Sequence, residues 1–169
     1  MRIVQLHLSI KTTLVCLLLS VTSNAQSAPR NLVGVVVAYK KVNRCPSCDG
    51  SNGGIGIQIE YWIVRVDDSG EKKFKGDRYI LVEYQMYQRS LSDSEINEKL
   101  RFEIRERQEH EKNHDCVGDI GYKEGEDYFL RPASGKDFER TRPGEDDKVP
   151  TDLKTLPCFI VERLPKVIG

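Results

Sequence analysis

The chain has 169 residues, of which 31% are charged, and its 26 basic residues equal its 26 acidic ones in number. This balance excludes the long-range attraction to nucleic acid or anionic lipid that a strongly basic protein has. We therefore expect a protein or a saccharide as the partner, and no nucleic acid.

The first 25 residues have the three parts of a secretory signal. Arg2 and Lys11 form a positive n-region, residues 12–22 form a short apolar run, and residues 23–25 (SNA) offer small side chains at a cleavage site. The apolar run is about half of the ~20 residues that a bilayer-spanning helix needs, so we expect cleavage and no stable membrane span afterwards. The sequence thus predicts a secreted or periplasmic single domain over 26–169, with a net charge of about −2 because the signal removes two basic residues.

Two strands are predicted in the first part of this domain. The β-branched residues 33–42 predict a buried strand, and the loop 43–56 follows it because its glycines and Pro46 suit neither a helix nor a strand. The second strand is expected over 57–66. Its apolar residues shift in phase by one, which predicts a β-bulge in its middle: Ile57, Ile59 and Tyr61 come first, then Trp62, Val64 and Val66.

A third strand is predicted over 79–88, after a turn at 67–70. Ser92 and Glu95 then form a capping-box pattern, which predicts the start of a helix. The residues that follow repeat both every four and every two positions, so a long helix and a helix followed by a strand are both possible. Phe102 would lie on the charged side of a long helix, and we therefore expect a helix over 92–98 and a strand over 99–107.

The segment 117–156 is rich in glycine, proline and charge, with a short extended piece expected near 128–131. A loop of this length is unusual in a compact domain, so it is expected to be a functional excursion or partly disordered. A last strand is predicted over 158–164. The order strand, strand, strand, helix, strand, long loop, strand predicts a mainly β, small five-stranded OB-like Greek-key barrel, with a β-sandwich as the alternative.

The predicted export makes the four cysteines of the domain candidates for two disulfides, for which three connectivities exist. In the predicted barrel Cys116 follows the fourth strand and Cys158 begins the fifth, which favours Cys116–Cys158 and leaves Cys45–Cys48 as a local bridge. A thiol-redox role of Cys45 and Cys48 is disfavoured because the glycine-rich residues after Cys48 cannot open a helix. A zinc site formed by Cys45, Cys48, Cys116 and either His114 or Cys158 is the alternative.

His110, Glu111 and His114 match the H-E-x-x-H pattern, in which two histidines bind zinc and the glutamate is the general base. Lys112 places a positive charge between the ligands, and residues 105–109 lack the apolar face that packs such a helix into a core. We therefore expect no catalytic residue and no cofactor. The alternative is a zinc metallohydrolase that uses this motif.

Aromatic residues gather on the second and third predicted strands, on the face that OB folds use to bind oligosaccharides. Trp62 and Tyr84 are expected in the core. Tyr79 and Tyr87 lie on the other face of the third strand, so they are the candidate ligand-binding residues.

Three short blocks resemble a group of small exported bacterial proteins of unknown function: residues 34–39 (GVVVAY), 101–104 (RFEI) with Cys116 beyond them, and 156–159 (LPCF). The order of elements also resembles the cysteine-bridged OB barrels of netrin-like and metalloprotease-inhibitor domains. The chain lacks their Cys-x-Cys start, so the resemblance does not imply inhibition. The leading hypothesis is a non-enzymatic exported binding module; a structural envelope protein without a ligand is a further alternative.

Overall fold

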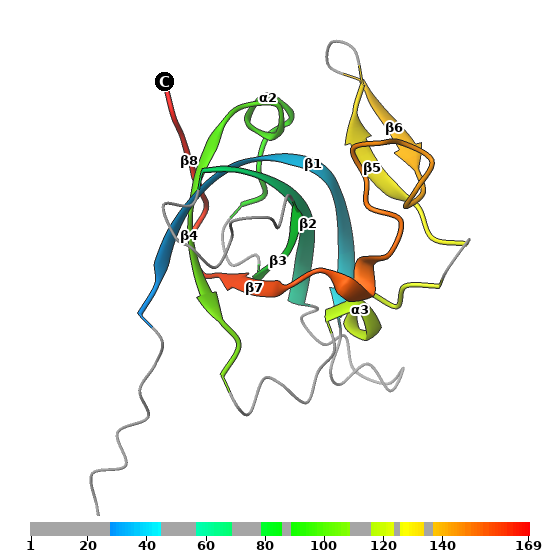
Figure 1. Cartoon of the computed structure of the whole chain (residues 1–169), viewed down its shortest axis with the longest axis horizontal. Coiled ribbons are helices and arrows are strands. Elements are labelled where there is room, and N and C mark those ends of the chain that lie inside the picture. The colour runs from blue at the N-terminus through cyan, green and yellow to red at the C-terminus, as the bar shows by residue number, and fades with distance from the viewer. Residues whose placement is uncertain are drawn as a thin grey trace, which may run out of the picture.

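The computed structural model describes residues 28–44, 57–68, 79–85, 89–108, 116–123, 126–133 and 137–169. Five strands close into a barrel (Figure 1), in the order β1 (Arg30–Arg44), β2 (Ile57–Asp68), β3 (Tyr79–Gln85), β7 (Cys158–Val161) and β4 (Leu100–Glu106). The barrel closes because β4 also pairs with β1, and β3 and β7 form its parallel pair. With helix α2 (Asp93–Ile96) between β3 and β4, this is the predicted OB-like Greek-key order.

Strand β1 is longer than predicted and bends around the barrel, since its first residues pair with β4 and the rest pair with β2. The backbones of β1 and β2 approach each other closely at Gly34. A Cβ atom there would lie 2.5 Å from the carbonyl oxygen of Arg65 and 2.8 Å from Cγ1 of Val64. Only glycine fits this backbone contact.

The β-bulge predicted in the middle of the second strand is wrong. The pairing of β1 with β2 runs without interruption past Tyr61 and Trp62. The register shifts instead between Val36 and Ala38, where Val37 is the extra residue, and between Val33 and Gly34, where Asp67 near the end of β2 is the extra residue. Strand β2 keeps a single alternation as far as Val66. It seemed to change phase in the sequence because both of its faces are buried, so apolar residues occur on each.

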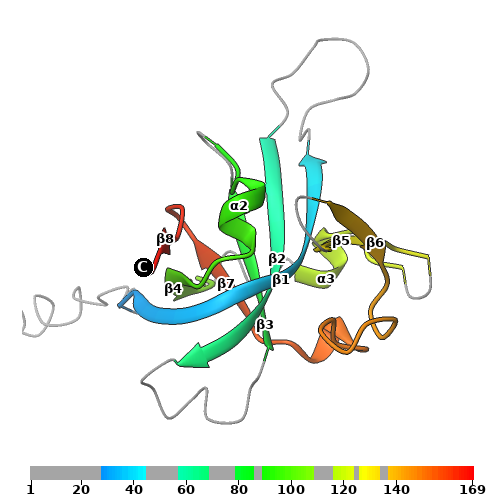
Figure 2. The same cartoon turned by 90° about the horizontal axis from the view of Figure 1, so that it is seen from above.

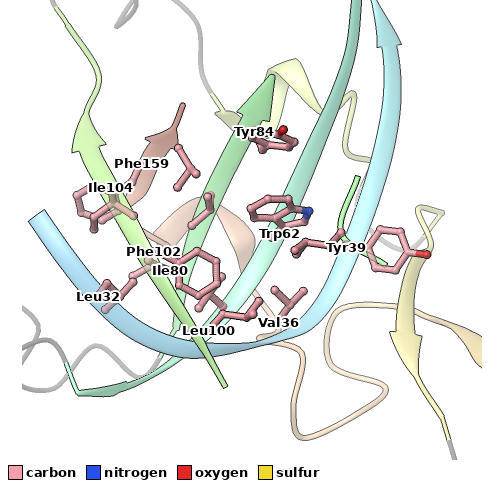
Figure 3. Packing of buried hydrophobic residues seen from close by; sticks show 14 of the residues in the cluster. Leu32, Val36, Tyr39, Trp62, Ile80, Tyr84, Leu100, Phe102, Ile104 and Phe159 are labelled. Atoms are coloured by element: carbon pink, nitrogen blue, oxygen red, sulfur yellow. The ribbon is translucent and has the colours of Figure 1, made fainter. Parts of the chain in front are cut away.

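The barrel interior is one hydrophobic core, to which the alternate residues of every barrel strand contribute (Figure 3). Trp62, Phe102 and Leu100 are fully buried in it, and Ile96 of α2 and Leu91 seal one side. The predicted capping box is present, because Ser92 and Glu95 each accept a hydrogen bond from the other's backbone N–H. Strand β4 alternates buried and exposed residues over its apolar half, as Phe102 indicated.

The segment predicted as a long loop contains ordered structure in its described parts. It forms α3 (Cys116–Asp119), a hairpin of β5 (Phe129–Pro132) and β6 (Phe138–Thr141), and the 3₁₀ helix η3 (Leu153–Thr155). Figure 2 shows α3, β5 and β6 on the opposite side of β2 from β4 and from the short C-terminal strand β8 (Lys166–Val167). The hairpin reaches β1 through Tyr39 and Leu130. The extended piece expected near 128–131 is confirmed as β5.

This excursion, residues 116–156, covers the outer face of β2 and β3. A second hydrophobic cluster forms there, with Ile59, Tyr61, Ile63 and Leu81 of the barrel beneath side chains of the excursion, among them Val117, Ile120, Phe129, Val149 and Leu153. Cys116 and Cys158 lie at disulfide distance, with Cα atoms 6.5 Å apart, as the barrel order predicted. They join the start of the excursion to β7. Cys45 and Cys48 lie outside the described residues. In the part of the chain that is described, no helix is long and apolar enough to cross a bilayer.

Candidate functional site: a buried carboxylate at the barrel mouth

Strand register brings five side chains together at the end of the barrel where β3 ends. Lys41 of β1 lies opposite Glu60 of β2, and Glu60 lies opposite Tyr84 of β3. In the next row along the strands, Tyr39 lies opposite Trp62. Residues directly opposite in antiparallel strands project from the same face of the sheet, so both rows face the barrel interior. We call these five residues, together with Ser90, the barrel mouth.

Glu60 is a carboxylate inside the barrel, with a side chain that is 2% exposed. Nε1 of Trp62 donates a hydrogen bond to its Oε2 at 3.0 Å. Its Oε1 is buried and accepts no hydrogen bond from any described residue. Burying a carboxylate is costly unless it is paired and hydrogen-bonded, so half of this group retains unused acceptor capacity.

Aromatic rings form the walls around this carboxylate. Trp62 and Tyr84 stack with ring centroids 5.0 Å apart and planes inclined by 25°, and Tyr39 lies beyond Trp62 on β1 (Figure 3). Burial raises the pKa of the Tyr39 hydroxyl, and the nearby carboxylates of Asp93 and Glu60 raise that pKa further. The pKa of Tyr84 is raised by burial and then by Glu60. Both phenols therefore stay neutral and retain their protons at neutral pH.

Lys41 supplies the charge that faces Glu60. Its Nζ lies 3.4 Å from Oε1 of Glu60, donates a hydrogen bond to Oγ of Ser90 at 3.2 Å, and lies 5.7 Å from the ring centroid of Tyr39. The Lys41 side chain is 41% exposed, so its ammonium closes the mouth from the solvent side. The arrangement is a buried carboxylate beside stacked aromatic rings, paired with the ammonium of Lys41 at its solvent side.

The turn that carries Ser90 is held in place by Arg89. The hydroxyl of Tyr84 donates to the backbone oxygen of Arg89 at 3.2 Å, and the Arg89 guanidinium binds both carboxylate oxygens of Glu95 at 2.7 and 2.9 Å. The hydrogen bond from Arg89, followed by those from Ser92, lowers the pKa of Glu95 to about 2. Because Glu95 also caps α2, this bidentate pair links the rim of the mouth to the helix.

The residues that the sequence singled out lie elsewhere. Tyr79 is half-buried against the excursion, and its hydroxyl donates to the backbone oxygen of Asp147 at 3.4 Å. Trp62 and Tyr84 are buried, as expected. The other candidates lie outside the described residues: Tyr87, His110, Glu111 and His114. Among the residues that are described, no three histidine, cysteine or acidic side chains gather in a way that could hold a metal ion.

Sequence reasoning missed Glu60 and Lys41. Counting back by two from Trp62 would have placed Glu60 inside the barrel, on the same face as Trp62 and Val64. The supposed bulge concealed this, because it assigned the interior to Ile59 and Tyr61 instead. A buried glutamate in an otherwise apolar strand face was the available signal.

At two other places on the surface, charged side chains pair with neighbours within the chain. A shallow hollow of about 190 Å³ beside β4 is lined by charged residues that include Arg105 and Glu162, and these two form an ion pair at 2.7 Å. On the excursion the exposed ring of Tyr128 lies under the Arg142 guanidinium, 4.4 Å from ring centroid to Cζ. Nε of Arg142 is buried without a hydrogen-bond partner among the described residues, but it is a donor on a guanidinium that already binds the Tyr128 hydroxyl, whereas the unsatisfied atom of Glu60 is a carboxylate oxygen.

Comparison with known proteins gives no relative. No protein-family model matches the chain, and neither a curated protein nor a solved structure matches it.

Proposed function

We propose that this protein is an exported, non-enzymatic binding module that contacts a partner protein through the barrel mouth. The observation that carries the proposal is Glu60: its side chain is 2% exposed, and its Oε1 has no hydrogen bond from a described residue and faces the half-exposed ammonium of Lys41. A buried polar atom with an unused acceptor requires an explanation, and a cationic group of a partner would supply one.

The covering of the opposite surface supports the same location. In OB folds the β2–β3 face commonly receives the ligand. Here Tyr61 and Ile63 on that face are fully buried under the excursion. A partner therefore needs a different surface, and the mouth offers a charged and partly open one.

Export is supported by the signal pattern of residues 1–25 and by the pairing of Cys116 with Cys158, since disulfides persist in oxidising compartments. Structural disulfides are rare in the cytosol. Mass spectrometry of the mature protein tests this part directly, with a new N-terminus near residue 26 as the expected result. An intact N-terminus with free thiols at both cysteines would contradict it.

Site-specific photo-cross-linking tests the contact surface. A benzophenone side chain is introduced at Asp93, which is exposed beside the mouth, and in a matched control at Lys154, which is exposed on the excursion. We expect a specific adduct in envelope extract from position 93, little from position 154, and loss of the adduct when Glu60→Gln is added.

Glu60→Gln keeps the size of the side chain and an acceptor for Trp62, so circular dichroism should show an unchanged fold. An adduct that survives Glu60→Gln in the folded variant would overturn the proposal. So would an adduct that forms equally from position 154, or the absence of any adduct at position 93.

A further inference from the structure

The ammonium of Lys41 lies among the other residues of the barrel mouth, where a cation from a partner could also bind. The Lys41 ammonium meets three different acceptors: Oε1 of Glu60, Oγ of Ser90 and the face of Tyr39. The contact with Glu60 is an ion pair at 3.4 Å without hydrogen-bond geometry, and the side chain is 41% exposed. An exposed lysine loses rotamer freedom when it is held in one place, so such a tether is weak and exchangeable.

The acceptors around Lys41 match one kind of cation. A primary ammonium has three N–H donors directed apart, which suits one carboxylate oxygen, one hydroxyl and one ring face. A guanidinium instead prefers to bind both oxygens of a carboxylate side by side. That mode is disfavoured here, because Oε2 of Glu60 already accepts a hydrogen bond from Nε1 of Trp62. A quaternary ammonium has no N–H donor for Oε1 or for Ser90.

We infer that the barrel mouth binds a primary ammonium group from a partner, which takes the place of Lys41 between Glu60, Ser90 and Tyr39. This inference rests on the proposed function and specifies its ligand class. The ammonium could belong to a lysine side chain or to a free alkylamine, because the two present the same group to the pocket.

Trp62 provides a direct reporter, since it is the only tryptophan in the chain and its indole N–H is bonded to Glu60. The Lys41→Met variant removes the internal ammonium while keeping an apolar stem of similar length. Its fluorescence is titrated with n-butylammonium, n-butylguanidinium, tetramethylammonium and Nα-acetyl-lysine amide, all as chlorides at constant ionic strength. Lys41→Met combined with Glu60→Gln is the matched control.

We expect saturable binding of butylammonium and of the lysine amide, roughly tenfold tighter or more than that of the guanidinium, because the latter would bind one carboxylate oxygen of Glu60 instead of its preferred two. Wild-type protein should bind both more weakly, since Lys41 competes. Binding should disappear in the double variant. Binding of butylammonium but not of the lysine amide would assign the site to free amines, and the reverse would assign it to lysine side chains of proteins.

Equal affinity for the guanidinium, binding that persists in the double variant, or no saturable change with either amine would overturn the inference. Should Lys41→Met fail to fold, the indole N–H resonance of Trp62 is followed in the wild-type protein during the same titrations, and an unmoved resonance has the same consequence. A failed titration together with Glu60-dependent cross-linking at Asp93 would reject the ligand class while leaving the proposed contact surface intact.

Discussion

Removal of the Cys116–Cys158 pair tests whether the excursion is held to the barrel covalently. The two cysteines are 42 residues apart in sequence. In the chain-entropy description, a cross-link over that separation stabilises the folded state by about 4 kcal/mol at 25 °C, by restricting the unfolded chain. Since a domain of this size is stable by only about 5–15 kcal/mol in total, the Cys116→Ser/Cys158→Ser variant should lose a large share of its free energy of unfolding.

Urea denaturation measures this loss. Trp62 fluorescence reports on the barrel interior, and far-ultraviolet circular dichroism reports on the whole fold. We expect the midpoint to fall and amide exchange to accelerate at Val117 and Ile120, which belong to the excursion and pack against the outer face of the barrel. Val117→Ala is the control for lost packing alone, with the disulfide intact. A double-serine variant whose free energy of unfolding falls by less than about 1 kcal/mol at an unchanged denaturant slope would refute the reasoning, because a cross-link that closes a loop of this length should stabilise the folded state by more than that.

Three further results are expected. Gly34→Ala should destabilise the protein by about 2–4 kcal/mol in urea denaturation, because its Cβ would lie 2.5 Å from a backbone oxygen. Gly121→Ala should cost only about 1–2 kcal/mol, because Gly121 has a positive φ but no atom near its Cβ position. Equal losses in the two variants would contradict this difference. Since the folded pKa of Glu95 is lowered to about 2, the stability due to its pairing with Arg89 is present above pH ~4.5 and is lost as the pH falls toward 2. The free energy of unfolding of Glu95→Gln, from thermal unfolding, should therefore change less over that pH range than that of the wild type, by about 1 kcal/mol once solvent screening is considered. Parallel curves of this free energy against pH for the two proteins would exclude the effect. Metal analysis of the purified protein should find no stoichiometric zinc, and zinc that is present in the wild type and lost in His110→Ala would instead support a metallohydrolase.

The barrel was predictable because its evidence is local and repeated. Ser92 and Glu95 indicate the start of a helix, and Phe102 fits only the strand pattern. The order of elements then limits the fold to a few possibilities. The pairing of Cys116 with Cys158 followed from the same order, because β4 and β7 are neighbours in the barrel.

The site was not predictable in the same way, because it depends on which face of β2 is the inside. Both faces carry apolar residues, so hydrophobic alternation cannot distinguish Tyr61 from Trp62. That ambiguity arises from the excursion, which buries the outer face and so removes the polar residues that normally mark it. Apart from the expected burial of Trp62, from which the direction of Glu60 could be counted, only the contact between distant parts of the chain decides which face of β2 is the inside.

The excursion therefore links fold and proposed function. By covering Ile59, Tyr61 and Leu81 it occupies the surface on which an OB barrel commonly receives its ligand, and the Cys116–Cys158 pair holds the start of this cover against β7. A second hydrophobic cluster forms on the outer face of β2 and β3, so that this face is no longer accessible to a ligand. In the proposed function, the partner therefore binds at the end of the barrel, where Glu60 lies in the same interior row as Lys41 and Tyr84. If the cover depends on its disulfide, a reduced protein would expose an apolar face as well as the mouth, so the proposed binding at Glu60 would be selective only in an oxidising compartment.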